Sequence, residues 1–204
     1  MKIKKILLII SILLFIYFIG GIFYSLTNKD EKTKENAKVD NGITIKGFSY
    51  ILYEDTPSIY KEEFNNLKKN LENKEINYEE YAKSISKMFL IDLYSLNLKK
   101  NMYDVGGTEF IYPESVENYK LNVQNTLYKY MEDNTDGKRK QELPEVKNVV
   151  IKDIEETEFK LEETKHKAFK INANIEYIKD LKYENKAEII IIKEDKYLYI
   201  VEKN

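Results

Sequence analysis

The chain begins with an uninterrupted apolar segment, residues 6–26 (ILLIISILLFIYFIGGIFYSL), which contains no charged residue and no proline. A helix of about 20 apolar residues, at 1.5 Å rise per residue, is long enough to cross a hydrocarbon core about 30 Å thick. Only a helix satisfies its own backbone hydrogen bonds there without a partner strand. The segment therefore predicts a single transmembrane anchor that has membrane lipid as its partner.

The charges beside this segment predict its orientation. Lys2, Lys4 and Lys5 precede it, and lysines next to a membrane span stay on the cytoplasmic side. Residues 1–5 are thus predicted to be a cytoplasmic tail, with the remainder outside the cytoplasm at the plasma membrane. A cleaved signal peptide is the alternative. Its apolar stretch would be shorter, about 7–15 residues, and residues 25–27 (SLT) make a poor cleavage site.

The composition argues against several classes of function. The absence of cysteine excludes disulfides, thiolate metal sites and a cysteine nucleophile. Of the 33 basic residues three precede the anchor, and the rest are outnumbered by 35 acidic residues, so nucleic acid is not expected as a partner. Gly106 and Gly107 lack the spacing of a phosphate-binding loop and instead indicate a turn that needs positive φ. No cofactor and no metal ion are expected.

The rest of the chain is predicted to be a tether followed by one domain. Residues 27–42 are polar and lack periodic apolar residues, as in a flexible tether, and residues 43–204 are predicted to form one extracytoplasmic domain. Three stretches inside it have apolar residues at the three- and four-residue spacings of a helix face. They cover residues 57–71, 78–96 and 114–131.

Residue types at the helix starts support these ranges. Thr56 is predicted to cap the first helix, with Pro57 at its first position. Asn77 is predicted to cap the second helix, with Glu80 as its capping-box partner. The stripes predicted to be buried are Tyr60, Phe64, Leu67 and Leu71; Ala82, Ile85, Phe89, Leu93 and Leu96; and Val116, Tyr119, Val123, Leu127 and Tyr130.

Strand patterns occupy most of the C-terminal half. A short strand is predicted at residues 108–112, and residues 43–53 are predicted to be an edge strand or an extended lead-in. The clearest alternation is Phe169, Ile171, Ala173, Ile175 and Tyr177, followed by a central apolar run at residues 189–192 and a last strand at residues 197–201. The predicted fold class is α+β: an N-terminal transmembrane helix, then helices packed on a curved antiparallel sheet, in the order α-α-β-α-β-β-β-β.

This order of elements, from residue 57 to residue 201, resembles the nuclear-transport-factor-2-like fold, also called the cystatin-like cone. With a single membrane anchor added, the chain is similar in architecture to bitopic assembly subunits of type IV secretion and conjugation machines. The resemblance implies a curved sheet that wraps the helices, a pocket between them, and a scaffold role outside the cytoplasm.

Two residues are candidates for chemistry. His166, the only histidine, lies in a predicted hairpin turn beside acidic residues, where an exposed turn residue is favoured over a metal ligand. Asp92 interrupts the apolar face of the second helix. A buried carboxylate there would act as a base, with Tyr81 or Tyr119 as hydrogen-bond partner, whereas at the helix margin it would simply be solvated.

The sequence therefore predicts a non-enzymatic, membrane-anchored interaction or scaffold module that acts on a protein partner or forms a homo-oligomer. The 17 tyrosines provide enough aromatic surface for such an interface. The alternative is a ligand-binding or catalytic cone that uses a pocket near Asp92. A polar pocket at Asp92 with a buried partner would favour that alternative.

Overall fold

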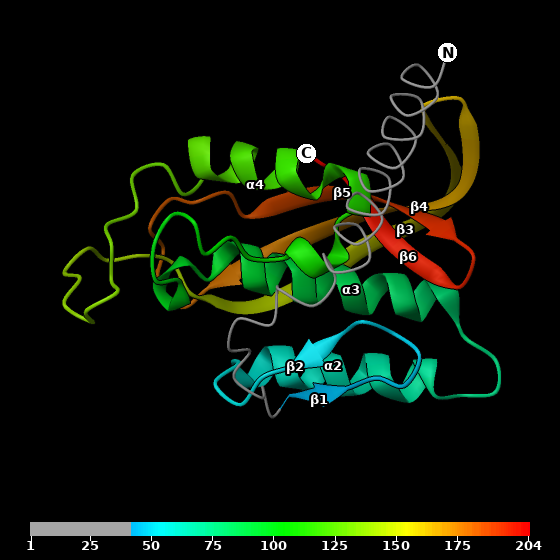
Figure 1. The fold of residues 1–204 in the computed structure, drawn as a ribbon, viewed down its shortest axis with the longest axis horizontal. Coiled ribbons are helices and arrows are strands. Elements are labelled where there is room, and N and C mark those ends of the chain that lie inside the picture. The colour runs from blue at the N-terminus through cyan, green and yellow to red at the C-terminus, as the bar shows by residue number, and fades with distance from the viewer. Residues whose placement is uncertain (1–41) are drawn as a thin grey trace, which may run out of the picture. The chain divides into compact units, whose positions relative to one another are not determined.

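The computed structural model describes residues 42–204, and the starts of its helices follow from local sequence (Figure 1). α2 (Ser58–Leu71) begins one residue later than predicted, so Pro57 stands at the N-cap position and Thr56 forms no side-chain cap. α3 (Tyr78–Tyr94) has the predicted Asn77 cap, because the Asn77 side chain accepts a hydrogen bond from the Glu80 N–H at 3.1 Å. The predicted capping box is not formed, since the Asn77 N–H donates to the Asn70 side chain and not to Glu80. α4 (Val116–Asn125) follows the 3-10 helix Pro113–Ser115.

The apolar stripes of α2 and α3 are buried as predicted. All four stripe residues of α2 are in the core. α3 is the most buried helix of the described residues, since it contacts α2 as well as β3 and β4. In Figure 1 it runs between α2 and α4 in front of the sheet. Leu96, the last residue of its predicted stripe, is also buried but lies in a separate 3-10 helix (Leu96–Leu98).

Four strands form an antiparallel sheet in sequence order. They are β3 (Val146–Leu161), β4 (Thr164–Tyr177), β5 (Lys186–Glu194) and β6 (Tyr197–Lys203). β4 has the predicted alternation, with Ile171 fully buried in the main core. β5 is a central strand covered on both faces, because Ile189 and Ile191 pack in the main core while Ile190 and Ile192 belong to a second cluster.

The predicted fold class is wrong in its order of elements. A hairpin of two short strands, β1 (Ile43–Thr44) and β2 (Ile51–Leu52), precedes α2. The strand predicted at residues 108–112 is instead a 3-10 helix, Thr108–Phe110, followed by a single bridge from Ile111 to Ile200. The pairing does not continue because the chain turns directly into another 3-10 helix, Pro113–Ser115.

The third predicted helix is too long. α4 ends at Asn125, and Thr126 leaves the helical region with φ −123° and ψ −91°. As a result Tyr130, predicted to be buried, is 79% exposed. Of the predicted stripe only Val123 is buried, while Val116, Tyr119 and Leu127 are partly buried and pack against the core.

The fold class also included a transmembrane helix, and this part is corrected for the described residues. Among residues 42–204 no helix is both long enough and apolar enough to cross a membrane. The predicted tail (1–5), the predicted anchor (6–26) and all but the last residue of the predicted tether (27–42) lie outside the described residues.

Candidate binding groove

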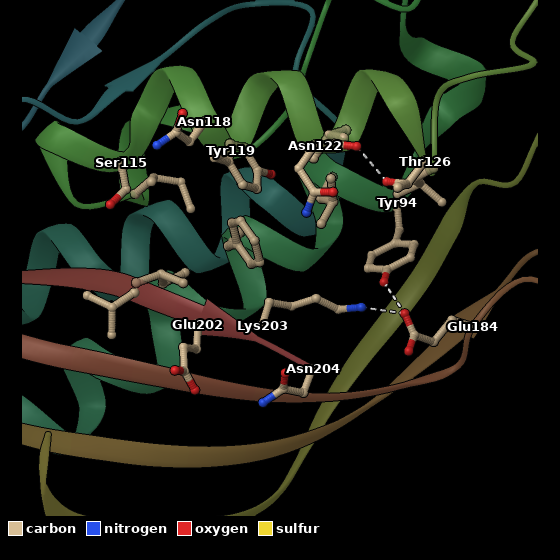
Figure 2. A pocket seen from close by; sticks show the side chains of 17 residues that line it. Tyr94, Ser115, Asn118, Tyr119, Asn122, Thr126, Glu184, Glu202, Lys203 and Asn204 are labelled. Atoms are coloured by element: carbon tan, nitrogen blue, oxygen red, sulfur yellow. Dashed lines mark hydrogen bonds and ion pairs between the residues drawn. The ribbon is translucent and has the colours of Figure 1, made fainter. Parts of the chain in front are cut away.

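A groove of about 820 Å³ lies between α4 and the end of β6 (Figure 2). α4 packs on the core through Val116, Tyr119 and Val123 but leaves a hollow between itself and the end of β6. Its floor is apolar and its rim is mainly neutral. The floor is lined by Phe89, Leu93, Ile111, Val123, Leu127 and Ile200, and the rim carries Ser115, Asn118, Asn122, Thr126, Glu202 and Asn204.

Charged side chains at one end of the groove bind one another. The Glu184 carboxylate accepts a hydrogen bond from the Tyr94 hydroxyl at 2.5 Å and forms an ion pair with the Lys203 ammonium (Figure 2). Partial burial raises the pKa of Glu184, but the bonds from Lys203 and Tyr94 outweigh it and hold the pKa below its ordinary value. The carboxylate of Glu184 is therefore held in its charged form by its two partners.

Asp92 lies in a second, smaller hollow of about 310 Å³, lined in part by Tyr53, Tyr60, Lys99 and Glu109. One carboxylate oxygen of Asp92 accepts a hydrogen bond from the Lys99 ammonium at 2.5 Å, and the other accepts the Gly107 N–H at 2.6 Å. Lys99 is only 9% exposed. The polar pocket and buried partner that favour the alternative function are therefore present.

The tyrosines predicted as partners of Asp92 bind elsewhere. The Tyr81 hydroxyl is 2.7 Å from the Tyr50 hydroxyl, and the Tyr119 hydroxyl donates to the Gly106 carbonyl at 2.7 Å. Tyr119 thus helps to fix the turn that follows Asp92 rather than its carboxylate. Sequence spacing placed these rings near Asp92 but does not indicate which way their hydroxyls point.

The two glycines beside Asp92 are required for different reasons. Gly107 has φ +74°, the left-handed region that the sequence analysis predicted for this turn. Gly106 is required because the Asp92 backbone leaves no room for a side chain: a Cβ at position 106 would lie 2.2 Å from the Asp92 carbonyl oxygen. The Asp92 backbone and side chain together therefore organise the turn at residues 104–107, which is a structural role that needs no ligand.

Glu109 was not identified from the sequence, which gives no sign that this carboxyl is buried. It accepts a hydrogen bond from the Tyr60 hydroxyl at 2.5 Å. Burial raises the pKa of Glu109 to about 7; the Tyr60 bond opposes this shift, and the charge of Asp92 adds to it. A carboxyl that titrates near neutral pH can donate or accept a proton, so Glu109 is the strongest candidate for chemistry in this hollow.

The raised pKa of Glu109 predicts a specific pH dependence. Because the folded-state pKa of about 7 lies above the ordinary value of 4.5, the folded protein retains a proton between these pH values. The stability that this proton contributes is fully present below pH 4.5. It is lost as the pH rises to 7, which lowers the free energy of unfolding by up to about 3 kcal/mol. Glu109→Gln should therefore be more stable than the parent at pH 8 and similar at pH 4.5, in urea unfolding. Parallel pH profiles for the two proteins would contradict this assignment.

His166 does not lie in the predicted turn. It is a residue of β4, paired with Phe159 across the β3–β4 ladder. Within residues 42–204 no group of three or more His, Cys, Asp or Glu side chains is arranged to hold a metal ion. The part of the chain that the structure describes thus offers His166 no ligand set.

Comparisons with protein-family models, with curated proteins and with solved structures found no match to this chain. The resemblance to the nuclear-transport-factor-2-like fold stays a prediction, and the function must be argued from the groove and the hollow themselves.

Proposed function

We propose that residues 42–204 form a non-enzymatic interaction module that binds an uncharged, extended segment of a protein partner in the groove between α4 and β6. The observation that carries this proposal is the combination of an apolar floor with a mainly neutral rim. Binding sites for specific partners combine a large apolar contact area with a few polar groups that fix orientation. The volume of about 820 Å³ is large enough for several side chains.

The rim suits a peptide backbone. Asn118, Asn122 and Asn204 each carry an amide that both donates and accepts hydrogen bonds. An extended peptide presents N–H and C=O groups alternately, and such amides satisfy both. The ion pair of Glu184 with Lys203 neutralises both charges at one end of the groove, and Glu202 is the remaining charged residue among those that line it. A partner segment without charges is therefore favoured.

The location of this module is proposed from the sequence of residues 6–26, which is apolar enough to hold the chain in the plasma membrane with residues 1–5 in the cytoplasm. Protease added to intact protoplasts should then digest residues 42–204, while a cytoplasmic control protein stays whole. Protection of the domain, or its release into the medium, would refute this location.

A second candidate function is favoured by the hollow at Asp92. Glu109 has a pKa near neutrality and lies with Asp92, Lys99 and Tyr60 around a space of about 310 Å³. These are groups that a general acid–base site uses. Against this reading, both oxygens of Asp92 are already bonded, to Lys99 and to a backbone N–H.

Asp92→Asn combined with Lys99→Gln distinguishes the two functions. The double substitution removes both charges of the pair together, so neither is left buried alone, and an amide still accepts the Gly107 N–H. For an interaction module we expect complementation of a deletion strain to be unchanged, with a stability loss of about 1–2 kcal/mol. Loss of complementation in a variant that still folds and still binds its partner would favour the acid–base site.

A further inference from the structure

The two edges of the four-stranded sheet are protected differently. At the β6 edge, the Tyr112 N–H donates to the Ile200 carbonyl at 3.0 Å, and Ile111 forms a bridge with Ile200. At the other edge β3, 16 residues long, pairs with β4 alone, and no other strand of residues 42–204 joins it. Unpaired N–H and C=O groups along such an edge are a template for pairing with another strand.

There is open space beside the β3 edge. A hollow of about 610 Å³ runs along residues 148–154, with Lys83 and Lys87 of α3 on its opposite side. Both lysines already have acidic partners within the domain, namely Glu79 and Glu80 for Lys83, and Glu63 for Lys87. The selection of a partner strand therefore depends mainly on the charges of β3 itself.

The charges of β3 are separated by sign along the strand. Its first half, residues 146–152, contains Lys147 and Lys152 and no acidic residue. Its second half, residues 153–161, contains a single lysine and four acidic residues, Asp153, Glu155, Glu156 and Glu158. All of these acidic residues, and both lysines of the first half, are exposed.

A second copy of the same strand complements this pattern. When two identical strands pair antiparallel about a twofold axis, the first half of each lies against the second half of the other. Opposite charges then face each other across the pair, whereas parallel pairing would place like charges together. Lysines and bulges also protect lone edges, and β3 has bulges at 146/148 and 151/153. β4 places Lys170 opposite Glu155 and Lys167 opposite Glu158 on one side of β3, but no strand of residues 42–204 supplies such partners on its other side.

We infer that this protein forms a homodimer in which the β3 strands of two copies pair antiparallel into one continuous sheet. This interface is separate from the groove between α4 and β6, so it leaves that groove free and goes beyond the proposed function. The midpoint of the charge pattern, between Lys152 and Asp153, lies closest to the twofold axis.

The absence of native cysteine allows a direct test with the full-length chain in its membrane. Residues facing each other across an antiparallel pair have Cβ atoms about 4.5–5.5 Å apart, close enough for a disulfide after a small shift. Across this axis Lys152 of one copy faces Asp153 of the other, and neither residue faces its own copy. A chain with both Lys152→Cys and Asp153→Cys should therefore give a covalent dimer at twice the 24.3 kDa chain mass under mild oxidation. Asp136→Cys, in an exposed turn outside the sheet, should not. Absence of a dimer from the double-cysteine chain would overturn the inference.

Charge exchange identifies the pairing as antiparallel. In the background that carries both Lys152→Cys and Asp153→Cys, Lys147→Glu makes the remaining charge of the first half acidic. In the same background, Glu155→Lys with Glu156→Lys makes the second half basic. Each variant alone should lose at least tenfold of the cross-linked dimer, and co-expression of the two should restore it. Because a misfolded chain is not restored by mixing, restoration supports the interface. Undiminished cross-linking of each variant alone, or failure of the mixture, would contradict it.

Discussion

Ile171→Asp should prevent the domain from folding. Ile171 is fully buried in the main core, where it lies between Ile154 of β3 and Ile189 of β5. A carboxylate placed there has no cation to pair with, and its burial costs at least several kcal/mol, of the order of the whole stability of a domain of this size. We expect loss of the cooperative urea transition and of near-ultraviolet circular dichroism.

Asn174→Asp is the matched control for this substitution. Asn174 lies on the opposite face of β4, beside Val150 and Lys186, so a new carboxylate there meets a lysine. The change in the free energy of unfolding should stay within about 0.5 kcal/mol. Asn172 is a poorer control, because it lies between Asp153 and Glu188 and an added acid would be repelled. Similar losses at positions 171 and 174 would contradict the assignment of the two faces.

The periodic parts of the fold could be predicted from the sequence. The stripes of α2 and α3, the Asn77 cap and the alternation of β4 are determined by local chemistry and burial, and all are present. The strand predicted at residues 108–112 failed because short apolar runs do not distinguish a strand from a 3-10 turn. The length of α4 failed because its apolar spacing continues past the point where the backbone turns at Thr126.

Asp92 could be singled out from the sequence, but the groove and the position of Glu109 could not, because they depend on contacts distant in sequence. Glu184 accepts a hydrogen bond from Tyr94, which is 90 residues away in the sequence. Glu109 accepts one from Tyr60, which is 49 residues away. The same holds for Arg139, the only arginine, whose guanidinium donates to the carbonyls of Asn97 and Lys99 at 2.7 and 2.9 Å. Periodicity identifies the face of a helix but not the partner that its polar groups reach.

Asn122→Arg should abolish partner binding without harming the fold. Asn122 lines the groove from α4 and is exposed (Figure 2). Arginine is a good helix former, so the helix should tolerate it. Its long charged side chain would cross the groove, and a partner segment would have to displace it or bury its charge against the apolar floor. We expect at least a hundredfold loss of affinity, about 3 kcal/mol.

Asn125→Arg is the control for this variant, since Asn125 is exposed on the same helix and does not line the groove. The most direct measurement of the central claim is complementation of a deletion strain by these two variants, at matched protein levels. We expect Asn125→Arg to complement fully and Asn122→Arg to fail. Full complementation by Asn122→Arg would contradict the claim that the groove between α4 and β6 is the binding site.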